Sequence, residues 1–320
     1  MASNDNYVLI IGSSNMDLNI YSKRFPIPGE TVTGGIFTQS FGGKGANQAV
    51  ASSRSGSKTV FIGRVGQDPF GSQMLENLTN EGIDTTRVIV DPEHASGVAV
   101  ILIDSNGQNM ISVAPGANAE ITPEDIQNIK DIIENATVIV VQMEIPMDVI
   151  RDIFNITSKK NVITILNPAP FKEIPLKLLK QIDIITPNEN ELSQLHSSLG
   201  LKELQKNDQD YILNLINDLH GQGVNTIIVT LGNKGCFVSN KDKEEQIHVP
   251  AIKVSAIDTV GAGDCFNGVL ASRLCEGYEL LIATRYANVA ASIAVTKTGA
   301  QSSMPFFAEI EKRFNQYYII

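Results

Sequence analysis

The sequence contains few of the residues that build disulfide frameworks or zinc sites. Its 320 residues include only three cysteines, Cys236, Cys265 and Cys275, and no two of them form a C-x-x-C pair. The four histidines contain no H-E-x-x-H pattern. A small, odd number of cysteines argues against a disulfide-linked fold and against a structural zinc site. We interpret the three cysteines as small core residues.

Signals for export or membrane insertion are also lacking. The N-terminus, MASNDNYVLIIG, has no basic segment and only a short apolar run, so it does not resemble a signal peptide. The longest apolar run, residues 98–103, is far shorter than the roughly 20 residues that a membrane-spanning helix requires. We therefore predict a cytoplasmic protein with no membrane partner.

Basic residues are outnumbered by acidic ones. Lys and Arg total 25 against 35 Asp and Glu, and the formal net charge is −10. Nucleic-acid-binding domains usually carry a basic face, so this balance argues against a nucleic-acid partner. An anionic ligand must then be bound by local features of the chain. The 42% hydrophobic content is enough for a sizeable core and excludes a disordered chain.

Common nucleotide-binding and hydrolase motifs are absent as well. Gly43-Lys44 is followed by Gly45 instead of the Ser or Thr of a P-loop. No G-x-G-x-x-G dinucleotide motif and no G-x-S-x-G nucleophile motif occurs. These absences argue against P-loop NTPases, NAD enzymes and α/β-hydrolases.

What the chain does have is an alternation of short apolar segments with helical patterns. The segments 138–141, 162–166 and 226–230 are apolar and rich in β-branched residues, and helical spacing fills much of the sequence between them. This alternation predicts one doubly wound α/β domain over residues 1–320, with a mostly parallel sheet and helices on both of its faces.

Two segments, about 14–41 and 97–114, do not fit this alternation. They are rich in turn residues and alternate weakly, which predicts small strands. Ser105-Asn106-Gly107 in the second segment indicates a hairpin turn. We assign both segments to a small accessory β-sheet, which would be a discontinuous second unit.

The most informative motif is D-T-V-G-A-G-D, residues 258–264, which precedes a stretch with helical apolar spacing. The Gly261-Ala262-Gly263 turn would place unpaired N–H groups and the positive end of the dipole at the start of that helix, an arrangement that binds anions. Asp264 would lie in the first turn, where its ionised form is favoured, as a general base requires. A glycine turn with an Asp that merely caps the helix is the alternative.

Two N-terminal motifs have the composition of a site for a polyhydroxylated ligand. F-G-G-K-G-A-N-Q-A, residues 41–49, combines bare glycine backbone with Lys44 and Asn47. Asn15 and Asp17 are two residues apart, so an extended segment presents both on one side. Amides and carboxylates hydrogen-bond readily to hydroxyl groups. A flexible turn at 41–49 and an Asx-turn after the first strand are the alternatives.

Polar residues also follow several predicted strands. Glu144 follows the strand 138–141, and T-P-N-E-N-E at 186–191 and T-L-G-N-K-G at 230–235 lie at the ends of two others. Open α/β sheets bind ligands at the carboxyl ends of their strands. The alternatives are a solvated acid at Glu144, helix capping at 186–191 and a plain hairpin at 230–235.

These motifs together resemble those of the PfkB family of carbohydrate kinases over nearly the whole chain. The resemblance rests on N-M-D at 15–17, P-G-E-T at 28–31, G-G-K-G-A-N-Q-A at 42–49, G-R-V-G-Q-D-P-F-G at 63–71, D-T-V-G-A-G-D at 258–264 and K-T-G-A-Q at 297–301. The N-terminal and C-terminal motifs lie more than half the chain apart, in the order that the family has. The forms at 42–49 and 297–301 resemble the ribose-phosphorylating members.

The resemblance implies a role for individual positions. Asp264 matches the catalytic base, and Gly261, Ala262 and Gly263 match the anion hole for the transferred phosphoryl group. The positions that match the sugar-binding residues and their neighbours are Asn15, Met16, Asp17, Gly42, Gly43, Lys44, Gly45, Ala46, Asn47 and Glu144, together with Asp264. The positions that match nucleotide contacts are Asn188, Thr230, Leu231, Gly232, Asn233, Lys234, Gly235, Gly263 and Asn288.

Two cations are implied in the same way. The positions that match the family's potassium site are Asp258, Val260, Ala294, Lys297, Gly299 and Ser303, several of them acting through backbone carbonyls. Asn188 and Glu191 match the N-x-x-E element, which orders Mg²⁺ through water.

The implied activity is transfer of the terminal phosphate of ATP to the 5-hydroxyl of D-ribose, which gives ribose 5-phosphate and ADP. The accessory sheet would be the family's lid and its homodimer contact. Two alternatives stay open: another kinase of the family, acting on deoxyribose, fructose or adenosine, and a non-catalytic sugar- or nucleotide-sensing module on the same fold.

Overall fold

The computed structural model describes residues 6–202, 204, 210–243 and 245–318. The strands are β1 (Val8–Ile11), β2 (Asn15–Tyr21), β3 (Ile36–Gly42), β4 (Thr59–Ile62), β5 (Arg64–Gly66), β6 (Ile89–Asp91), β7 (Gly97–Ile103), β8 (Asn109–Ala114), β9 (Val138–Gln142), β10 (Ile163–Asn167), β11 (Ile184–Ile185), β12 (Thr226–Thr230), β13 (Cys236–Asn240) and β14 (Glu245–Val249). The α-helices are α1 (Lys44–Arg54), α2 (Pro69–Asn80), α3 (Pro123–Asn128), α4 (Lys130–Asn135), α5 (Met147–Thr157), α6 (Leu176–Leu179), α7 (Glu189–Ser198), α8 (Tyr211–Gly221), α9 (Ala262–Cys275), α10 (Leu280–Ala294) and α11 (Phe307–Tyr318). The 3₁₀ helices are η1 (Gly116–Glu120), η2 (Gly232–Lys234), η3 (Lys241–Lys243) and η4 (Gln301–Ser303).

A central sheet forms the frame on which the site is built. Its order is β14-β13-β12-β11-β10-β9-β1-β4, in which β12 to β4 run parallel and β13 and β14 are antiparallel additions at one edge. The chain passes from β1 to the edge strand β4 and then returns to β9 on the other side of β1. The direction of strand addition therefore reverses at β1, and open α/β sheets bind ligands at the carboxyl ends of the strands beside such a reversal.

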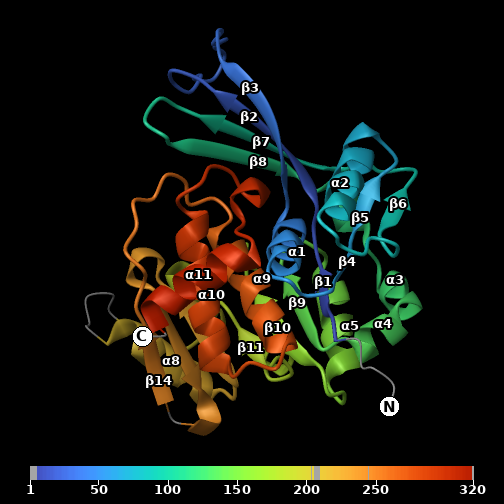
Figure 1. The fold of residues 1–320 in the computed structure, drawn as a ribbon. Coiled ribbons are helices and arrows are strands. Elements are labelled where there is room, and N and C mark those ends of the chain that lie inside the picture. The colour runs from blue at the N-terminus through green and yellow to red at the C-terminus, as the bar shows by residue number, and fades with distance from the viewer. Residues whose placement is uncertain (1–5, 203, 205–209, 244, 319–320) are drawn as a thin grey trace.

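The central strands are buried on both faces. Val8 and Ile10 of β1 belong to one core, together with residues of α1, α9 and α10, whereas Leu9 and Ile11 belong to the opposite core, with residues of α5 and α8. Successive side chains of a strand point to opposite faces, so a strand covered on both sides must be continuously apolar. Figure 1 shows α9, α10 and α11 gathered on one face of the sheet.

A second sheet, in the order β3-β2-β7-β8, projects from this body (Figure 1). Its strands fall within or close to the two segments that the sequence assigned to an accessory sheet. Only residues 12–14 separate β1 from β2, so the polar start of β2 lies at the carboxyl end of β1. The β7–β8 hairpin turns at Gly107, whose φ of 76° suits glycine.

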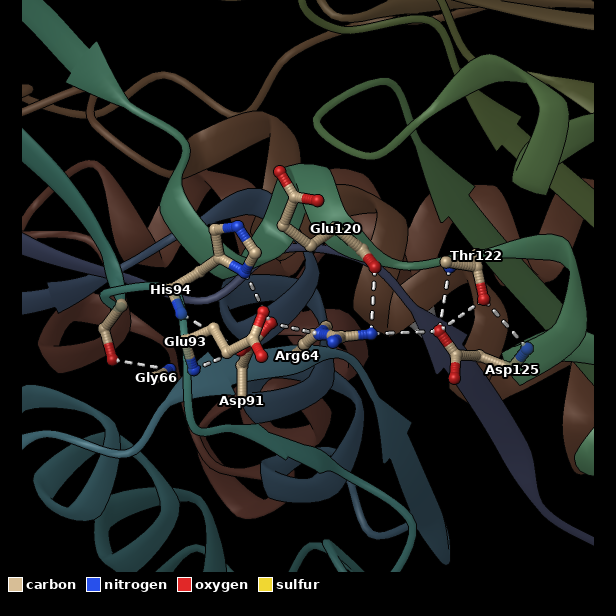
Figure 2. Close-up of polar contacts among 9 residues, drawn as sticks. Arg64, Gly66, Asp91, Glu93, His94, Glu120, Thr122 and Asp125 are labelled. Carbon is tan, nitrogen blue, oxygen red and sulfur yellow. Dashed lines mark hydrogen bonds and ion pairs between the residues drawn. The ribbon is translucent and has the colours of Figure 1, made fainter.

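A cluster of polar contacts fastens the segments next to β7 and β8 to the body (Figure 2). Arg64 of β5 donates from Nε to Asp91 Oδ2 at 2.7 Å, and from Nη1 to the Glu120 carbonyl at 2.9 Å and to Asp125 Oδ2 at 3.2 Å. The backbone N–H of Glu93 donates to Asp91 at 2.8 Å and is the main cause that holds the pKa of this carboxyl well below its usual value. Asp91 precedes β7 and Glu120 follows β8, so the cluster anchors both ends of that hairpin.

The fold class predicted from the sequence is confirmed: a mostly parallel, doubly wound sheet has helices on both faces, and a small separate sheet exists. The hairpin β13–β14 was not predicted. The segment 230–235 forms the turn between β12 and β13, so its plain hairpin interpretation describes the local structure. Among the described residues, no helix combines the length and the apolar character that crossing a bilayer needs.

Candidate active site

Asp264 lies at the start of α9, directly after the glycine turn. Gly261 is the N-cap and has a φ of 73°, a left-handed conformation that glycine adopts without strain. The N–H of Ala262 donates to the carbonyl of Thr259 at 3.3 Å. The N–H groups of Gly263 and Asp264 are also in the first turn, where the helix itself supplies no acceptor. With the positive end of the helix dipole, this turn has the geometry of an anion-binding site.

Two side-chain amides hold the Asp264 carboxylate, which is only 6% exposed. Asn47 donates from Nδ2 to Oδ2, and Gln48 donates from Nε2 to Oδ1, both at 2.9 Å. Both donors belong to α1, so the motif at 41–49 meets the motif at 258–264. Asn47 Oδ1 is buried and has no hydrogen-bond partner within the described chain, which fits a ligand hydroxyl as its donor.

The glycine loop before α1 packs directly on the turn after β1. Gly43 has a φ of 85°, and a Cβ on it would lie 2.8 Å from backbone atoms of Ser14 and Asn15. Glu144, just after β9, fixes this loop because its Oε2 accepts the Lys44 N–H at 3.0 Å and the Ser13 hydroxyl at 2.5 Å. Glu144 is therefore a helix-capping partner rather than a solvated acid at a strand end.

Asn15 begins β2, and Asn118 of η1 clamps it. Asn118 Nδ2 donates to Asn15 Oδ1 at 2.8 Å, while the same side chain bonds to the N–H and the carbonyl of Ser14 at 2.9 and 3.1 Å. Asp17 lies two residues further along β2 and shares its face of the strand with Asn15. A Cβ on Gly42 would lie 2.2 Å from Asp17 Oδ2, so glycine at that position leaves room for the carboxylate.

Carboxylates crowd this region, and their charges act on one another. Burial is the main cause that raises the pKa of Asp17 to about 7, and the negative charges of Glu144 and Asp264 contribute to the same rise. The negative charge of Asp264 is the main cause that raises the pKa of Lys44, so this lysine remains an ammonium ion. Burial likewise raises the pKa of Glu191, which the hydrogen bond from the Asn188 N–H and then the charge of Lys44 partly offset. Lys44 is thus the local cation that an anionic substrate would meet.

A cavity of about 580 Å³ lies beside the α9 turn and is lined in part by Thr259, Ala262 and Gly263. Of the positions matched to nucleotide contacts, those that line it are Thr230, Gly232, Asn233, Gly235, Gly263 and Asn288. Leu231 and Lys234 belong to the same turn but do not line this cavity. Its size is within the usual range for small-molecule and cofactor sites, and it shares Gly263 with the anion-binding turn.

Asn188 and Glu191 form a reciprocal cap on α7. Asn188 Oδ1 accepts the Glu191 N–H at 2.9 Å, and Glu191 Oε2 accepts the Asn188 N–H at 2.8 Å. This is the helix-capping interpretation of the motif. Glu191 is nevertheless close enough to Lys44 and Asp264 for their charges to affect its pKa, so the cap lies at the edge of the site.

Asp258 ties together the two segments that carry the positions matched to a potassium site. Its Oδ1 accepts the Val260 N–H at 3.0 Å and its Oδ2 accepts the Gly299 N–H at 2.8 Å. The Lys297 ammonium pairs with Glu309 at 2.9 Å. A lysine side chain has no acceptor, so only the backbone carbonyl of Lys297 can contribute an oxygen to a cation. Ala294 ends α10, and Ser303 ends η4.

Several polar side chains that support the site were not predicted. Asn118 holds the start of β2, while Gln48, Gln142 and Asn167 form a buried row behind Asp264. The sequence signal for the last three was their position, within the 41–49 motif or at the end of a strand. Nothing in a single sequence indicates that such residues contact one another.

Fold and site together define an α/β protein with a buried carboxylate between an anion-binding turn and the polar side chains at the start of β2 and in the 42–47 loop. The model of the pfkB family carbohydrate kinases matches residues 5–306. The chain is 40% identical over 311 residues to the ribokinase of Staphylococcus aureus, covering 96% of this chain and 99% of that protein. It is 35% identical over 311 residues to the deoxyribokinase of Salmonella typhi, covering 97% and 98%.

The structure of Arabidopsis thaliana ribokinase complexed with ribose and ATP matches with a TM-score of 0.88 at 31% identity, covering 97% of this chain and 98% of that chain. The chain therefore belongs to the PfkB family of carbohydrate kinases, and the family resemblance inferred from the sequence is confirmed.

Proposed function

We propose that this protein is an ATP-dependent kinase that phosphorylates D-ribose at its 5-hydroxyl. The observation that carries the proposal is the placement of Asp264, held by Asn47 and Gln48 beside a turn that also borders the 580 Å³ cavity. The full-length relatives named ribokinase support ribose as the acceptor. The sugar would bind against Asn15, Asp17, the 42–47 loop and the unpartnered oxygen of Asn47.

The chemical step follows from these positions. Asp264 takes the proton of the 5-hydroxyl as its oxygen attacks the γ-phosphorus of ATP. The bond between the γ-phosphorus and the bridging oxygen to the β-phosphate breaks, and ADP leaves with the electron pair. N–H groups of the 261–264 turn and the Lys44 ammonium stabilise the charge on the transferred group. Because the chain has a net charge of −10, these local groups must supply that stabilisation.

Two cations fit the residues present. Asn188 and Glu191 border the site with carboxylate and amide oxygens, the donors that Mg²⁺ prefers, and when bound this ion would neutralise phosphate charge. The family resemblance assigns a K⁺ site to carbonyls of Val260, Ala294, Lys297 and Gly299, with Ser303, and Asp258 fits this site because it joins Val260 to Gly299. When bound, K⁺ would add positive field near the anion-binding turn.

We also propose that the accessory sheet acts as a lid over the sugar and that two copies pair through it in the cytoplasm. The sheet starts at the sugar site, because β2 carries Asn15 and Asp17. Its outer part exposes large apolar side chains on β3 and β8, among them Phe37, Met110 and Ile111. An exposed apolar sheet of this kind is typical of an interaction surface.

The first experiment is coupled measurement of ADP release with MgATP and D-ribose, beside 2-deoxyribose, fructose and adenosine, in K⁺ or in Na⁺. We expect turnover with ribose far above the others and stimulation by K⁺. Preference for another acceptor, such as the deoxyribose suggested by one relative's name, would replace ribose in the proposal. Ligand binding without any turnover would support the non-catalytic alternative.

The role of Asp264 is tested by Asp264→Asn, which keeps the shape of the side chain but removes the base. We expect kcat to fall at least about 10²-fold while ribose binding, measured by calorimetry, persists. Asp148→Asn, an exposed acid in the first turn of α5, is the matched control. A near-normal kcat in Asp264→Asn would remove this residue from the role of base.

A further inference from the structure

A row of buried amide side chains lies behind the Asp264 carboxylate. Gln48 on α1, Gln142 at the end of β9 and Asn167 at the end of β10 are each no more than 7% exposed. Gln48 donates from Nε2 to Asp264 Oδ1 at 2.9 Å and to Asn167 Oδ1 at 3.2 Å, and its Oε1 accepts from Gln142 Nε2 at 2.7 Å. Burying amides is unfavourable unless they are hydrogen-bonded, so a row of them requires a reason that apolar packing does not supply.

The charge of Asp264 and the carbonyl of Thr186 together determine the orientation of the amides in the row. An ionised carboxylate only accepts hydrogen bonds, so Gln48 must turn its Nε2 toward Asp264 and its Oε1 toward Gln142. Gln142 must then present its Nε2, as it does. Asn167 presents its Oδ1 to Gln48 because its Nδ2 donates to the Thr186 carbonyl at 3.0 Å. These contacts form one consistent set of donors and acceptors around Gln48, which holds its amide in a single orientation. Gln142 Oε1, at the end of the row, is buried and has no hydrogen-bond partner among the described residues.

A second arm of the row reaches the anion-binding turn. The Thr186 hydroxyl donates to Asn267 Oδ1 at 2.6 Å, and Asn267 Nδ2 donates to the Gly263 carbonyl at 2.9 Å. The same network thus contacts Asp264 and Gly263, and it connects both to the carboxyl ends of β9 and β10 and to the segment after β11. Fixed strand ends are rigid supports for groups that must be placed accurately.

Gln48 and Asn47 have different surroundings although both donate to Asp264. Asn47 keeps an unpartnered Oδ1 that suits a ligand, whereas the Gln48 amide is engaged through its oxygen and twice through its nitrogen, with side chains of the protein. Gln48 is also fully buried. Its direct contact with a proposed reacting group is therefore the hydrogen bond to Asp264.

We propose that Gln48 is a positioning residue, which Gln142 and Asn167 orient and which fixes the Asp264 carboxylate where it takes the hydroxyl proton. This inference rests on the proposed function, in which Asp264 is the base. The family resemblance assigns Gln48 no role. A displacement of about 1 Å at a reacting group can lower a rate by about 10²-fold, so the contribution of a positioning residue is measurable.

The test replaces Gln48 by methionine, which has a similar volume but neither donates to Asp264 nor accepts from Gln142. In full-length enzyme with MgATP and D-ribose, we expect Gln48→Met to lower kcat by about 10-fold to 100-fold. We expect KM for ribose and for ATP to change by less than about threefold, since Gln48 does not touch either ligand. A loss confined to KM would overturn the proposal.

Ser52→Ala is the matched control for loss of a buried polar group on the same helix. The Ser52 hydroxyl is within 2.9 Å of the Thr59 hydroxyl and lies one turn after Gln48, away from Asp264. We expect this variant to keep the wild-type kcat even where its melting temperature falls. A kcat loss in Ser52→Ala equal to that of Gln48→Met would assign the effect to helix packing.

If Gln48→Met does not fold, Gln142→Met replaces it in the same test, with an expected decrease in kcat of about 3-fold to 10-fold.

The decisive readout is a double-mutant cycle with Asp264→Ala. If Gln48 acts through Asp264, Gln48→Met lowers kcat by less than about twofold once Asp264 is absent. Multiplicative losses would show that Gln48 acts separately and would overturn the inference while leaving the base intact. A near-normal kcat in Asp264→Ala alone would instead overturn the proposed role of Asp264, so the two failures are distinguishable.

Discussion

At the residue scale, Asp17, which we propose binds the sugar, is in surroundings that disfavour its charged form. Its carboxylate lies in a narrow space over Gly42, where burial and two neighbouring carboxylates raise its pKa to about 7. The site therefore keeps a group near its titration point at neutral pH. A sugar hydroxyl needs the ionised form as a strong acceptor.

The first prediction at this scale concerns sugar binding. KM for ribose is expected to rise as the pH falls below about 7, because Asp17 gains a proton there. Asp17→Asn is expected to raise KM for ribose at pH 8 by about 10-fold or more, because the free energy of a hydrogen bond to a charged group corresponds to at least that factor in binding. The same variant should show a flat KM between pH 6 and 8. Steady-state kinetics at several pH values checks this, and a pH dependence that survives in Asp17→Asn would contradict it.

The same raised pKa of Asp17 predicts that the ligand-free fold, unlike sugar binding, favours the protonated form of this side chain. Because the pKa of Asp17 in the folded protein is above its ordinary value of 3.8, the stabilising contribution of Asp17 is complete below about pH 4 and is lost as the pH rises through about 7. Asp17→Asn should therefore raise the melting temperature more at pH 8 than at pH 5. Thermal melts of the ligand-free protein test the sign, with Asp148→Asn as an exposed control. Equal shifts at the two pH values would be inconsistent with a raised pKa.

At the scale of elements, the site depends on helix starts fixed by groups from other parts of the fold. Glu144 beside β9 caps α1, and Asp258 joins the segment before α9 to the segment after α10. Helix α9 thus begins in a turn that residues 299–303 support. The position of the N–H groups in the 261–264 turn therefore depends on the contact between Asp258 and Gly299.

This arrangement predicts how the proposed cation site responds to mutation. Asp258→Ala should remove the stimulation of turnover by K⁺, because both carboxylate contacts, to Val260 and Gly299, are lost. Lys297→Met should retain the stimulation, since its side chain pairs with Glu309 and only its carbonyl belongs to the proposed site. ADP release in K⁺ and in Na⁺ is the measurement. Unchanged stimulation in Asp258→Ala would reject the cation assignment.

At the scale of the whole molecule, the projecting sheet exposes apolar side chains on both faces. Phe37 and Met110 lie on one face and Ile36 and Ile111 on the other, as the strand register requires. All four are more than half exposed. A monomer rarely leaves a large patch of this kind in water, which is why we propose that a second copy covers it.

The corresponding prediction is that a charge on this sheet prevents pairing. Phe37→Asp or Ile111→Asp should convert the protein from a dimer to a monomer in light scattering at micromolar concentration. Tyr317→Asp places the same charge on an exposed aromatic of α11 and should leave the dimer intact. A wild-type protein that is already monomeric would reject the proposed pairing.

The sequence by itself determined the class of fold and the family. The alternation of apolar strands with helices requires a covered parallel sheet, and the motifs at 42–49 and 258–264 are local runs whose chemistry can be read without coordinates. The antiparallel hairpin β13–β14 was missed because its strands contain several polar residues and lack the continuous apolar run of the predicted central strands. The capping pair Asn188 and Glu191 depends on neighbours three residues apart, so a local pattern could suggest it.

Only the tertiary structure decided which distant polar groups meet. Gln48 contacts Asp264 across 216 positions of sequence, and Glu144 contacts the Lys44 N–H across 100. Which residues form such pairs depends on how α1 and α9 pack against the ends of β9 and β10, and no local propensity encodes that packing. The orientation of the buried amides follows in turn from the charge of Asp264 and the carbonyl of Thr186, and so exists only after the fold has brought these groups together.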